Sequence, residues 1–438
     1  MRSRRFLGDK CPTNRRCADR SSQIVIALEE VLRLVCDDLV PLPSVEYSVA
    51  DALGCVSAYE VVAREALPGF SNSSMDGFAL RSVDTSRGPT RLTVVDTVLA
   101  GDVPTTTVNE GEAMRVMTGA PLPNGADCVC MIEESTVDAD GRSVVIDRTI
   151  RVGEFVRRPG DDVTVGQSLI ASGERVTPTV VGVAKGQGLK SLHVHPRPRV
   201  GVMSTGHELV DHEGPLPNGK IRDMNRPMLL ALLRDSGFTP VDLGIVEDDV
   251  SMIRSTFERG CDTCHAVVST GGVSVGDVDF VKTALAELCG PRARSMQVAM
   301  RPGKPFTFAT AGSPSIPLFG LAGNPVSTLV GFEMFVRPAL RRLAGHRSLE
   351  RPRLHMVLDC DLARNADGRL HLVHVVARVR PDGRVHVERA LRQGSHLLSA
   401  VTQANALVMV PDGEGLRVGD TVVGILLQPD DVMASNDD

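Results

Sequence analysis

Three glycine-rich polar stretches contain the residue types expected around a phosphate-bearing ligand. They are residues 204–208 (STGHE), 269–276 (STGGVSVG) and 320–327 (GLAGNPVS). Glycine lets the backbone approach a ligand closely and turn its N–H groups toward it. A helix that begins at Pro325 would add N–H groups that favour an anion. Each stretch alone is also typical of a tight turn, but three together indicate a phosphate site.

Two cations and several acids accompany these stretches. Arg301 and Lys304 flank a Pro-Gly turn, which predicts a clamp for an oxyanion or phosphate on a chain that is acidic overall; a solvated surface pair is the alternative. The acids are Glu208, Asp223, Asp277 and Asp279. Carboxylates near phosphate repel it unless a divalent cation bridges them, so the mixture indicates Mg²⁺. For any single acid, helix N-capping is the competing interpretation.

The segment Gly272-Val-Ser-Val-Gly276 also fits the G-x-S-x-G pattern of a hydrolase nucleophile elbow. That interpretation would make Ser274 the nucleophile and requires an acid and a histidine further along the chain. The histidines that follow come only from the end of the α/β segment onward, most of them in a β-rich segment. A serine hydrolase is therefore a minor alternative.

The N-terminal half holds a second concentration of polar residues. The stretches are 67–80 (LPGFSNSSMDGFAL), 111–129 (GEAMRVMTGAPLPNGADCV) and 157–163 (RRPGDDV). Each reads as a surface loop, and their spacing does not establish that they meet.

The elements that must position these residues follow from hydrophobic periodicity. Residues 21–39 have helical spacing, and short alternating runs over 44–195 predict small β-rich modules. From 196 to 347, apolar strands alternate with helical segments, which predicts an open parallel α/β sheet with helices on both faces. From 348 onward, alternation with Asp-Gly turns predicts a β-barrel or sandwich. Ligands of an open α/β sheet sit beyond the carboxyl ends of its strands, where all three glycine-rich stretches fall.

The composition excludes several classes of protein. The chain has 438 residues, a net charge of −6, no tryptophan and two tyrosines, which disfavours nucleic-acid binding. No apolar run is long enough for a membrane span, and the ten cysteines show no disulfide framework. The basic segment 1–21 lacks the apolar core of a signal peptide and is expected to be a disordered arm. We expect a cytoplasmic protein.

The motifs together resemble one family, the molybdopterin molybdenumtransferases of the MoeA type, which are related to the E domain of gephyrin. The matching stretches, in the family's order, are NSSMDGFA, RVMTGAPLPNGAD, RPGDDV, STGHEL, IRDMNRP, STGGVSVGDVDF, RPGKP, AGNPVS and GSHLLSAVTQANAL. They span roughly residues 22–428.

The resemblance implies a homodimer of four-domain subunits: a discontinuous β-rich linker domain (22–65 with its helix, and 164–195), a second α+β domain (66–163), a molybdopterin-binding α/β domain (196–347) and a C-terminal β-barrel domain (348–438). It implies the last step of molybdenum cofactor synthesis, in which adenylylated molybdopterin and molybdate give the cofactor and AMP with Mg²⁺. Molybdopterin adenylyltransferase and molybdoenzyme maturation proteins are possible further partners.

The resemblance also implies the roles of individual residues. The catalytic acids would be Asp76, Asp162, Glu208, Asp223 and Asp279, with Glu208 and Asp279 holding Mg²⁺. The substrate-binding residues would be Thr118, Ser204, Gly206, Gly271, Gly272, Ser274, Gly276, Arg301, Lys304, Gly323, Asn324, Pro325 and Ser395. The cleft would form between the α/β domain of one subunit and the second domain of the other.

The chain departs from the family pattern at a few positions. Ala322 replaces a proline, Arg301 replaces a lysine, Ser71 replaces an aspartate, and the strand before Pro381 has fewer arginines. Arg keeps the charge of Lys but presents a planar fork. A molybdopterin-binding scaffold with weakened catalysis is the alternative function.

Overall fold

The computed structural model describes residues 25–272, 279–390 and 394–432, which belong to two units. The first unit combines Met1–Leu42 with Arg197–Asp438, and the second is Pro43–Pro196. No helix in the described part of the chain is long and apolar enough to cross a membrane.

A seven-stranded sheet forms the centre of the first unit. Its order is β1 (Val25–Ile26), β20 (Arg294–Val298), β22 (Pro305–Ala311), β23 (Ile316–Leu321), β19 (Ala266–Thr270), β15 (Arg199–Thr205) and β18 (Thr239–Val246). Strands β23, β19, β15 and β18 run parallel, as the βα alternation predicts. Strand β22 is antiparallel to both of its neighbours. The short connections 299–304 and 312–315 explain this reversal, because a parallel return needs a crossover of about a dozen residues or more.

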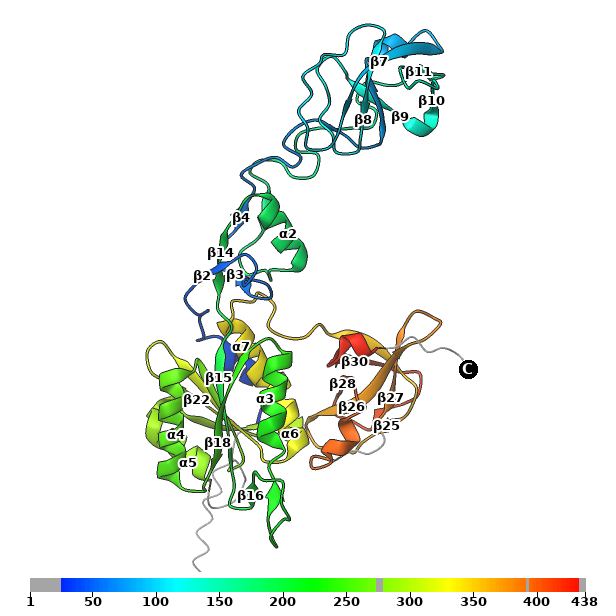
Figure 1. Cartoon of the computed structure of the whole chain (residues 1–438). Coiled ribbons are helices and arrows are strands. Elements are labelled where there is room, and N and C mark those ends of the chain that lie inside the picture. The colour runs from blue at the N-terminus through cyan, green and yellow to red at the C-terminus, as the bar shows by residue number, and fades with distance from the viewer. Residues whose placement is uncertain (1–24, 273–278, 391–393, 433–438) are drawn as a thin grey trace, which may run out of the picture. The chain divides into compact units, whose positions relative to one another are not determined.

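Helices cover both faces of this sheet, which confirms the doubly wound α/β expectation (Figure 1). One face packs against α1 (Leu28–Cys36), α3 (Asn225–Asp235), α6 (Pro325–Gly331), a π-helical turn (Phe332–Val336) and α7 (Arg337–Leu343). The other packs against α4 (Val250–Thr263) and α5 (Phe280–Cys289). Successive side chains of a strand point to opposite faces. Thus Val268 joins the first core and Val267 the second, which is why these strands read as continuous apolar runs.

The N-terminal helix differs from its sequence expectation in length and in location. Val25 and Ile26 form β1, parallel to β20, and the helix begins only at Leu28. Leu28, Val31 and Val35 are buried in the core of the α/β sheet. The helix expected to belong with 164–195 therefore packs in the first unit. Its amphipathic pattern predicts a buried face but does not specify the surface that covers it.

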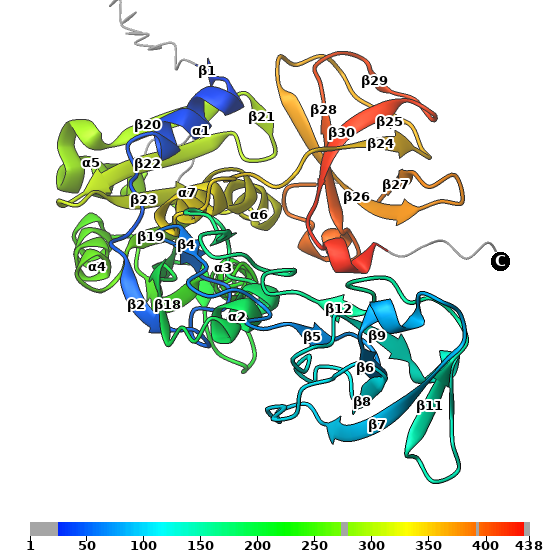
Figure 2. The same cartoon turned by 90° about the horizontal axis from the view of Figure 1, so that it is seen from above.

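A closed β-barrel forms the C-terminal part of the first unit. Its strands are β24 (Leu354–Leu358), β26 (Leu370–Val379), β27 (Val385–Arg389), β28 (Ala406–Val410) and β30 (Thr421–Leu426). The additional pairing of β26 with β28 closes the ring, as Figure 2 shows from above. The short strand β21 (Met300–Arg301) pairs with β26, so Arg301 lies against the barrel. Short pairs outside these sheets are β16 (Leu209–Val210) with β17 (Ile221–Arg222), and β25 (Leu362–Ala363) with β29 (Gly415–Leu416).

A buried histidine gives the barrel a pH-dependent stability. His374 on β26 is 2% exposed, and burial lowers its pKa to about 4. The unfolded chain, with a histidine pKa of about 6.5, therefore binds more protons than the folded chain between these values. Stability is full above about pH 6.5 and falls as the pH drops toward 4, by about 3 kcal/mol in total. Denaturant unfolding at several pH values should show this slope in the wild type and in His355→Gln, but not in His374→Gln. The exposed His355→Gln is the control, and an unchanged slope in His374→Gln would refute the assignment.

The second unit is built largely from β-strands. Its largest sheet has the order β10 (Ser135–Val137), β11 (Ser143–Ile146), β7 (Thr90–Val98), β8 (Glu112–Val116), β6 (Gly77–Leu80) and β9 (Cys128–Met131). Smaller sheets pair β2 (Val45–Ser48) and β3 (Val56–Ser57) with β14 (Ser191–His195), β4 (Val61–Val62) with β13 (Ser168–Ile170), and β5 (Asn72–Ser73) with β12 (Val156–Arg157). Residues 45–62 and 168–195 thus share sheets. Helix α2 (Pro178–Gly186) begins with Thr177 as its N-cap.

Candidate functional site

The carboxyl ends of three neighbouring strands meet at one edge of the α/β sheet. In the strand register Ser204 of β15 stands beside Thr270 of β19, and Thr270 stands beside Leu321 of β23. Their loops are the glycine-rich stretches singled out from the sequence. The structure therefore brings the described residues of these stretches, 204–208, 269–272 and 320–327, together at the edge where an α/β sheet binds its ligands.

Asn225, the first residue of α3, links these loops. Its Nδ2 donates to Thr270 Oγ1 at 2.9 Å and to the carbonyl oxygen of Gly323 at 2.7 Å. Thr328 Oγ1 donates to the carbonyl oxygen of Ala322 at 2.6 Å and lies 3.3 Å from Thr270 Oγ1. The proline-to-alanine departure at 322 keeps this carbonyl, because the main chain supplies it. Sequence reasoning missed Asn225, and its place in the quoted IRDMNRP stretch was the available signal.

Close backbone packing explains the glycine at position 271. Gly271 has φ of +93°, and a Cβ there would lie 2.2 Å from the carbonyl oxygen of Thr205. The next strand end is also close, since a Cβ on Gly323 would lie 3.6 Å from Gly271 Cα. Ser204 and Thr205 are buried, and their hydroxyl oxygens find no hydrogen-bond partner within the described part of the chain. The main chain at this edge is thus tightly packed, and the hydroxyl groups of Ser204 and Thr205 have no hydrogen-bond partner within the described residues.

The predicted acids differ in their surroundings. Asp223 is used structurally: it accepts the N–H groups of Asn225 and Arg226, each at 3.1 Å, and pairs with the Arg226 guanidinium. Its side chain is 2% exposed. Arg226 also pairs with Asp211 and Asp242. Asp223 therefore accepts the first N–H groups of α3 from the position before the N-cap residue, Met224, a structural role close to the capping expected as the alternative.

Asp279 and Glu208 follow the neighbouring strands β19 and β15. Asp279 is the N-cap of α5, accepting the Lys282 N–H at 2.9 Å. Burial raises the pKa of Asp279, against the opposing effects of the Lys282 N–H and charge. Glu208 is exposed, and its carboxylate folds over Gly206, where a Cβ would lie 2.7 Å from Oε2. Ser274, Gly276 and Asp277 lie outside the described residues.

The carboxylates of Glu208 and Asp279 could supply only part of the ligands that Mg²⁺ needs. Over residues 25–272, 279–390 and 394–432, no group of three or more His, Cys, Asp or Glu side chains is arranged to hold a metal ion. Mg²⁺ commonly takes one or two carboxylates and completes its shell with water and substrate phosphates. Glu208 and Asp279 are of the right type and follow adjacent strands, so the donor set fits a metal that binds together with its substrate.

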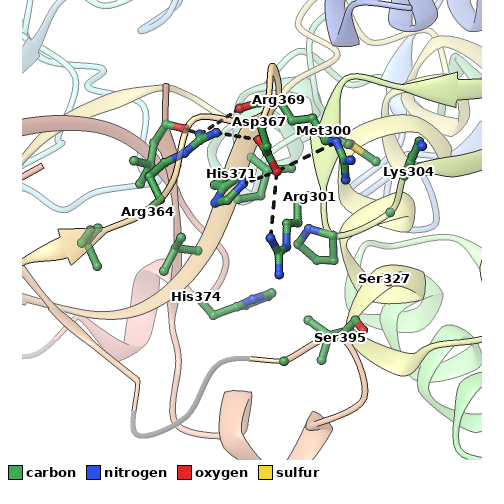
Figure 3. A pocket seen from close by; sticks show the side chains of 18 of the residues that line it. Met300, Arg301, Lys304, Ser327, Arg364, Asp367, Arg369, His371, His374 and Ser395 are labelled. Atoms are coloured by element: carbon green, nitrogen blue, oxygen red, sulfur yellow. Dashed lines mark hydrogen bonds and ion pairs between the residues drawn. The ribbon is translucent and has the colours of Figure 1, made fainter. Parts of the chain in front are cut away.

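A cavity of about 690 Å³ lies between the Arg301–Lys304 turn and the barrel (Figure 3). We call it the cationic cleft. Its cationic lining residues are Arg301, Lys304, Arg364, Arg369 and Arg389, and the histidines His371 and His374 also line it. The sequence pointed to Arg301 and Lys304. The others come from the barrel, from the loop before β26 and from strands β26 and β27, where single basic residues gave no signal.

The start of α6 connects the cationic cleft with the carboxyl ends of β15, β19 and β23, which we call the strand edge. Val326 and Ser327 line the cleft, and Pro325 is the first residue of the helix. Asn324 Nδ2 donates to Ser395 Oγ at 3.4 Å, and the Val326 N–H donates to the Ser395 carbonyl at 3.1 Å. The loop of β23 thus touches the glycines on one side and the cleft on the other.

In the second unit the structure brings two of the predicted residues together. Asp76 Oδ1 accepts the Thr118 N–H at 2.7 Å and the Thr118 hydroxyl at 2.9 Å. The bond from the Thr118 N–H is the main cause of the lowered pKa of Asp76. Asp162 is exposed, and its N–H donates to the carbonyl of Leu67 at 3.0 Å.

Comparisons with known proteins agree with the order of these parts. Residues 26–188 match the MoeA N-terminal region (domains I and II), 201–342 a probable molybdopterin binding domain, and 357–427 the MoeA C-terminal region (domain IV). Molybdopterin molybdenumtransferase 2 of Mycobacterium tuberculosis is 35% identical over 399 residues, covering 88% of this chain and 95% of the relative. The Bacillus subtilis molybdopterin molybdenumtransferase is 33% identical, covering 92% and 94%.

A solved structure resembles the chain over a similar extent. The molybdopterin biosynthesis moeA protein of Pyrococcus horikoshii OT3 has a TM-score of 0.79 and 28% sequence identity, covering 92% of this chain and all of that one. With the matched regions in the same order and relatives above 30% identity over most of the sequence, the chain belongs to the molybdopterin molybdenumtransferase family.

Proposed function

We propose that this protein catalyses the final step of molybdenum cofactor synthesis. Molybdate and adenylylated molybdopterin react to give the molybdenum cofactor and AMP, with Mg²⁺ required. The relatives' shared name, molybdopterin molybdenumtransferase, supports the reaction class. The observation that carries the proposal is the continuity between two sites of different character: a glycine-lined strand edge and a cationic cleft, joined by residues 323–327.

The strand edge has the properties needed to hold the phosphate-bearing pterin. The backbone at Gly271 and Gly323 approaches closely, and the N–H groups at the start of α6 favour an anion. Asn225 fixes the relative positions of these loops with two hydrogen bonds. Ordered donors of this kind stabilise negative charge without reorganising during reaction.

The cationic cleft would receive molybdate. Arg301 presents a planar fork and Lys304 a point charge, a combination suited to a tetrahedral oxyanion. Ser395 would add a hydroxyl beside them, held in place by Asn324 and Val326. A molybdate bound here would be close to the strand-edge loops, as insertion into the pterin requires.

Glu208 and Asp279 would hold Mg²⁺ at the strand edge together with the substrate's phosphates. The ion would neutralise charge on the phosphoanhydride as AMP leaves. Of the protein's own groups, Asp279 is fixed by capping α5, whereas Glu208 is exposed and can reorient.

We further propose a homodimer in which the second unit of one subunit completes the site of the other. Asp76, Thr118 and Asp162 would be its contribution. The support is the resemblance of their motifs to the family pattern and the fixed geometry of the Asp76–Thr118 pair.

The test is AMP release by the purified full-length protein, measured by chromatography. Adenylylated molybdopterin should yield AMP only when molybdate and Mg²⁺ are both present, and EDTA should stop the release. Pterin binding without AMP release under these conditions would instead support the scaffold function. Absence of both binding and release would refute the proposal.

A further inference from the structure

The cationic cleft contains a built-in anion. Its described lining carries five arginine or lysine side chains and a single carboxylate, that of Asp367 in the turn before β26. A carboxylate inside an oxyanion site opposes the ligand, because like charges repel. Its presence therefore calls for a physical explanation.

Asp367 is held firmly by Arg364, another residue of the cleft lining, and by Asp412, which lies outside that lining. Its Oδ1 accepts from Arg364 Nη2 at 2.7 Å, and Arg364 is 3% exposed. Arg364 also donates to the carbonyl oxygens of Arg369 and Pro411, which fixes its guanidinium. Asp412 accepts the N–H groups of Asp367 at 3.0 Å and Gly368 at 3.1 Å. The main chain at Asp367 and the Oδ1 atom of its side chain are therefore both held in place.

The second oxygen of Asp367 faces the basic groups of the cleft, as the dashed lines of Figure 3 show. Oδ2 lies 3.2 Å from His371 Nε2, 3.9 Å from Arg301 Nη1 and 4.0 Å from Arg369 Nε. The Arg301 side chain is 66% exposed. The position of Oδ2 is thus one that a bound oxyanion would compete for.

The ionisation of Asp367 is consistent with this placement. Burial acts to raise its pKa, but the hydrogen bond with His371 and the charges of His371, Arg369 and Arg364 outweigh it, and the pKa lies below its ordinary value. Asp367 therefore carries its negative charge across the neutral pH range.

We propose that Asp367 is a fixed counter-anion that competes with the incoming oxyanion for Arg301 and Arg369, and so sets the affinity of the cleft and its selectivity by ligand charge. This inference rests on the proposed function of the cleft as the oxyanion site. Oxyanion that is bound too tightly gains nothing in rate, since only interactions stronger in the transition state than in the ground state accelerate the reaction. A counter-anion keeps molybdate exchangeable while Arg301 remains positioned.

The charge dependence distinguishes this role from a purely structural one. A single fixed negative charge opposes a dianion with twice the Coulomb energy with which it opposes a monoanion of the same shape. We expect Asp367→Asn to tighten molybdate binding by about tenfold and perrhenate binding by about threefold, the square root of that factor. Perrhenate is a suitable probe because it is a tetrahedral monoanion of similar size.

The experiment is equilibrium dialysis of the full-length protein against molybdate or perrhenate, with metal quantified by mass spectrometry at one fixed pH and ionic strength. Asp367→Asn keeps an acceptor for Arg364, and Asp367→Glu keeps the charge and should remain near the wild-type affinity. Asp382→Asn is the matched control, because Asp382 pairs with His386 at the same 3.2 Å and the same i,i+4 spacing but does not line the cleft.

The outcomes separate this inference from the proposed function. If Arg301→Ala/Lys304→Ala weakens molybdate binding but Asp367→Asn leaves it unchanged or weakens it, only the counter-anion role is overturned. Equal gains for molybdate and perrhenate would also overturn that role. If the Arg301/Lys304 variant binds molybdate as the wild type does, or the wild type binds neither oxyanion, the cleft is not the oxyanion site and both proposals fail.

Discussion

Replacing both Arg301 and Lys304 by alanine is expected to lower kcat/KM for molybdate by at least about 100-fold, while the binding of adenylylated molybdopterin changes little. Both side chains line the cationic cleft, and Arg301 is held there by the pairing of β21 with β26. Losing the two charges removes stabilisation from the oxyanion without altering the strand edge. Steady-state AMP release at varied molybdate concentration measures the effect.

A matched control removes the same charge from elsewhere in the α/β fold. Arg254 and Arg292 are exposed, and neither lines the cleft. Arg254→Ala/Arg292→Ala should keep kcat/KM within about twofold of the wild type, as expected for exposed surface positions. If both double variants lost activity equally, overall charge rather than the cleft would be responsible.

Gly271→Ala is expected to disrupt the strand edge and to destabilise the α/β fold by about 3–5 kcal/mol. Two effects add: a non-glycine residue at a φ of +93° is strained, and its Cβ would lie 2.2 Å from the Thr205 carbonyl oxygen, which is backbone and cannot move aside cheaply. Denaturant unfolding measures the loss, and pterin affinity should fall with it.

Gly237→Ala isolates the strain from the clash. Gly237 follows α3 with φ of +81°, and no atom lies within 4 Å of a Cβ placed there. This variant should cost only about 1 kcal/mol and leave pterin binding intact. A Gly271→Ala protein as stable as Gly237→Ala would contradict the close packing of β15 and β19.

The strand edge could be predicted from the sequence because two general rules combine. Apolar strands alternating with helices predict a parallel sheet, and such a sheet binds ligands beyond its carboxyl ends. Residues 204–206, 270–272 and 321–325 were therefore expected at the same edge of the sheet, and the register shows that these strand ends adjoin. The β-barrel followed in the same way from alternation and Asp-Gly turns.

The sequence does not predict contacts of single side chains that depend on the order and pairing of the strands. Asn225 resembles any polar residue at a helix start, and its bonds to Thr270 and Gly323 depend on the sheet order. The residues Arg364, Asp367 and His371 reach the cleft only because β21 pairs with β26. Asp223 is an example of a residue whose type and position suggest a site acid, whereas the structure shows its carboxylate paired with Arg226.

The most direct test of the central claim is the molybdenum balance of a single turnover. The full-length protein would be mixed with excess molybdate, Mg²⁺ and a limiting amount of adenylylated molybdopterin, and the pterin fraction would then be separated from free oxyanion. Molybdenum in the pterin product and AMP in solution should appear in equal amounts and at equal rates. AMP released without molybdenum entering the pterin, or no AMP at all, would contradict the assignment of this protein as a molybdenum-inserting transferase.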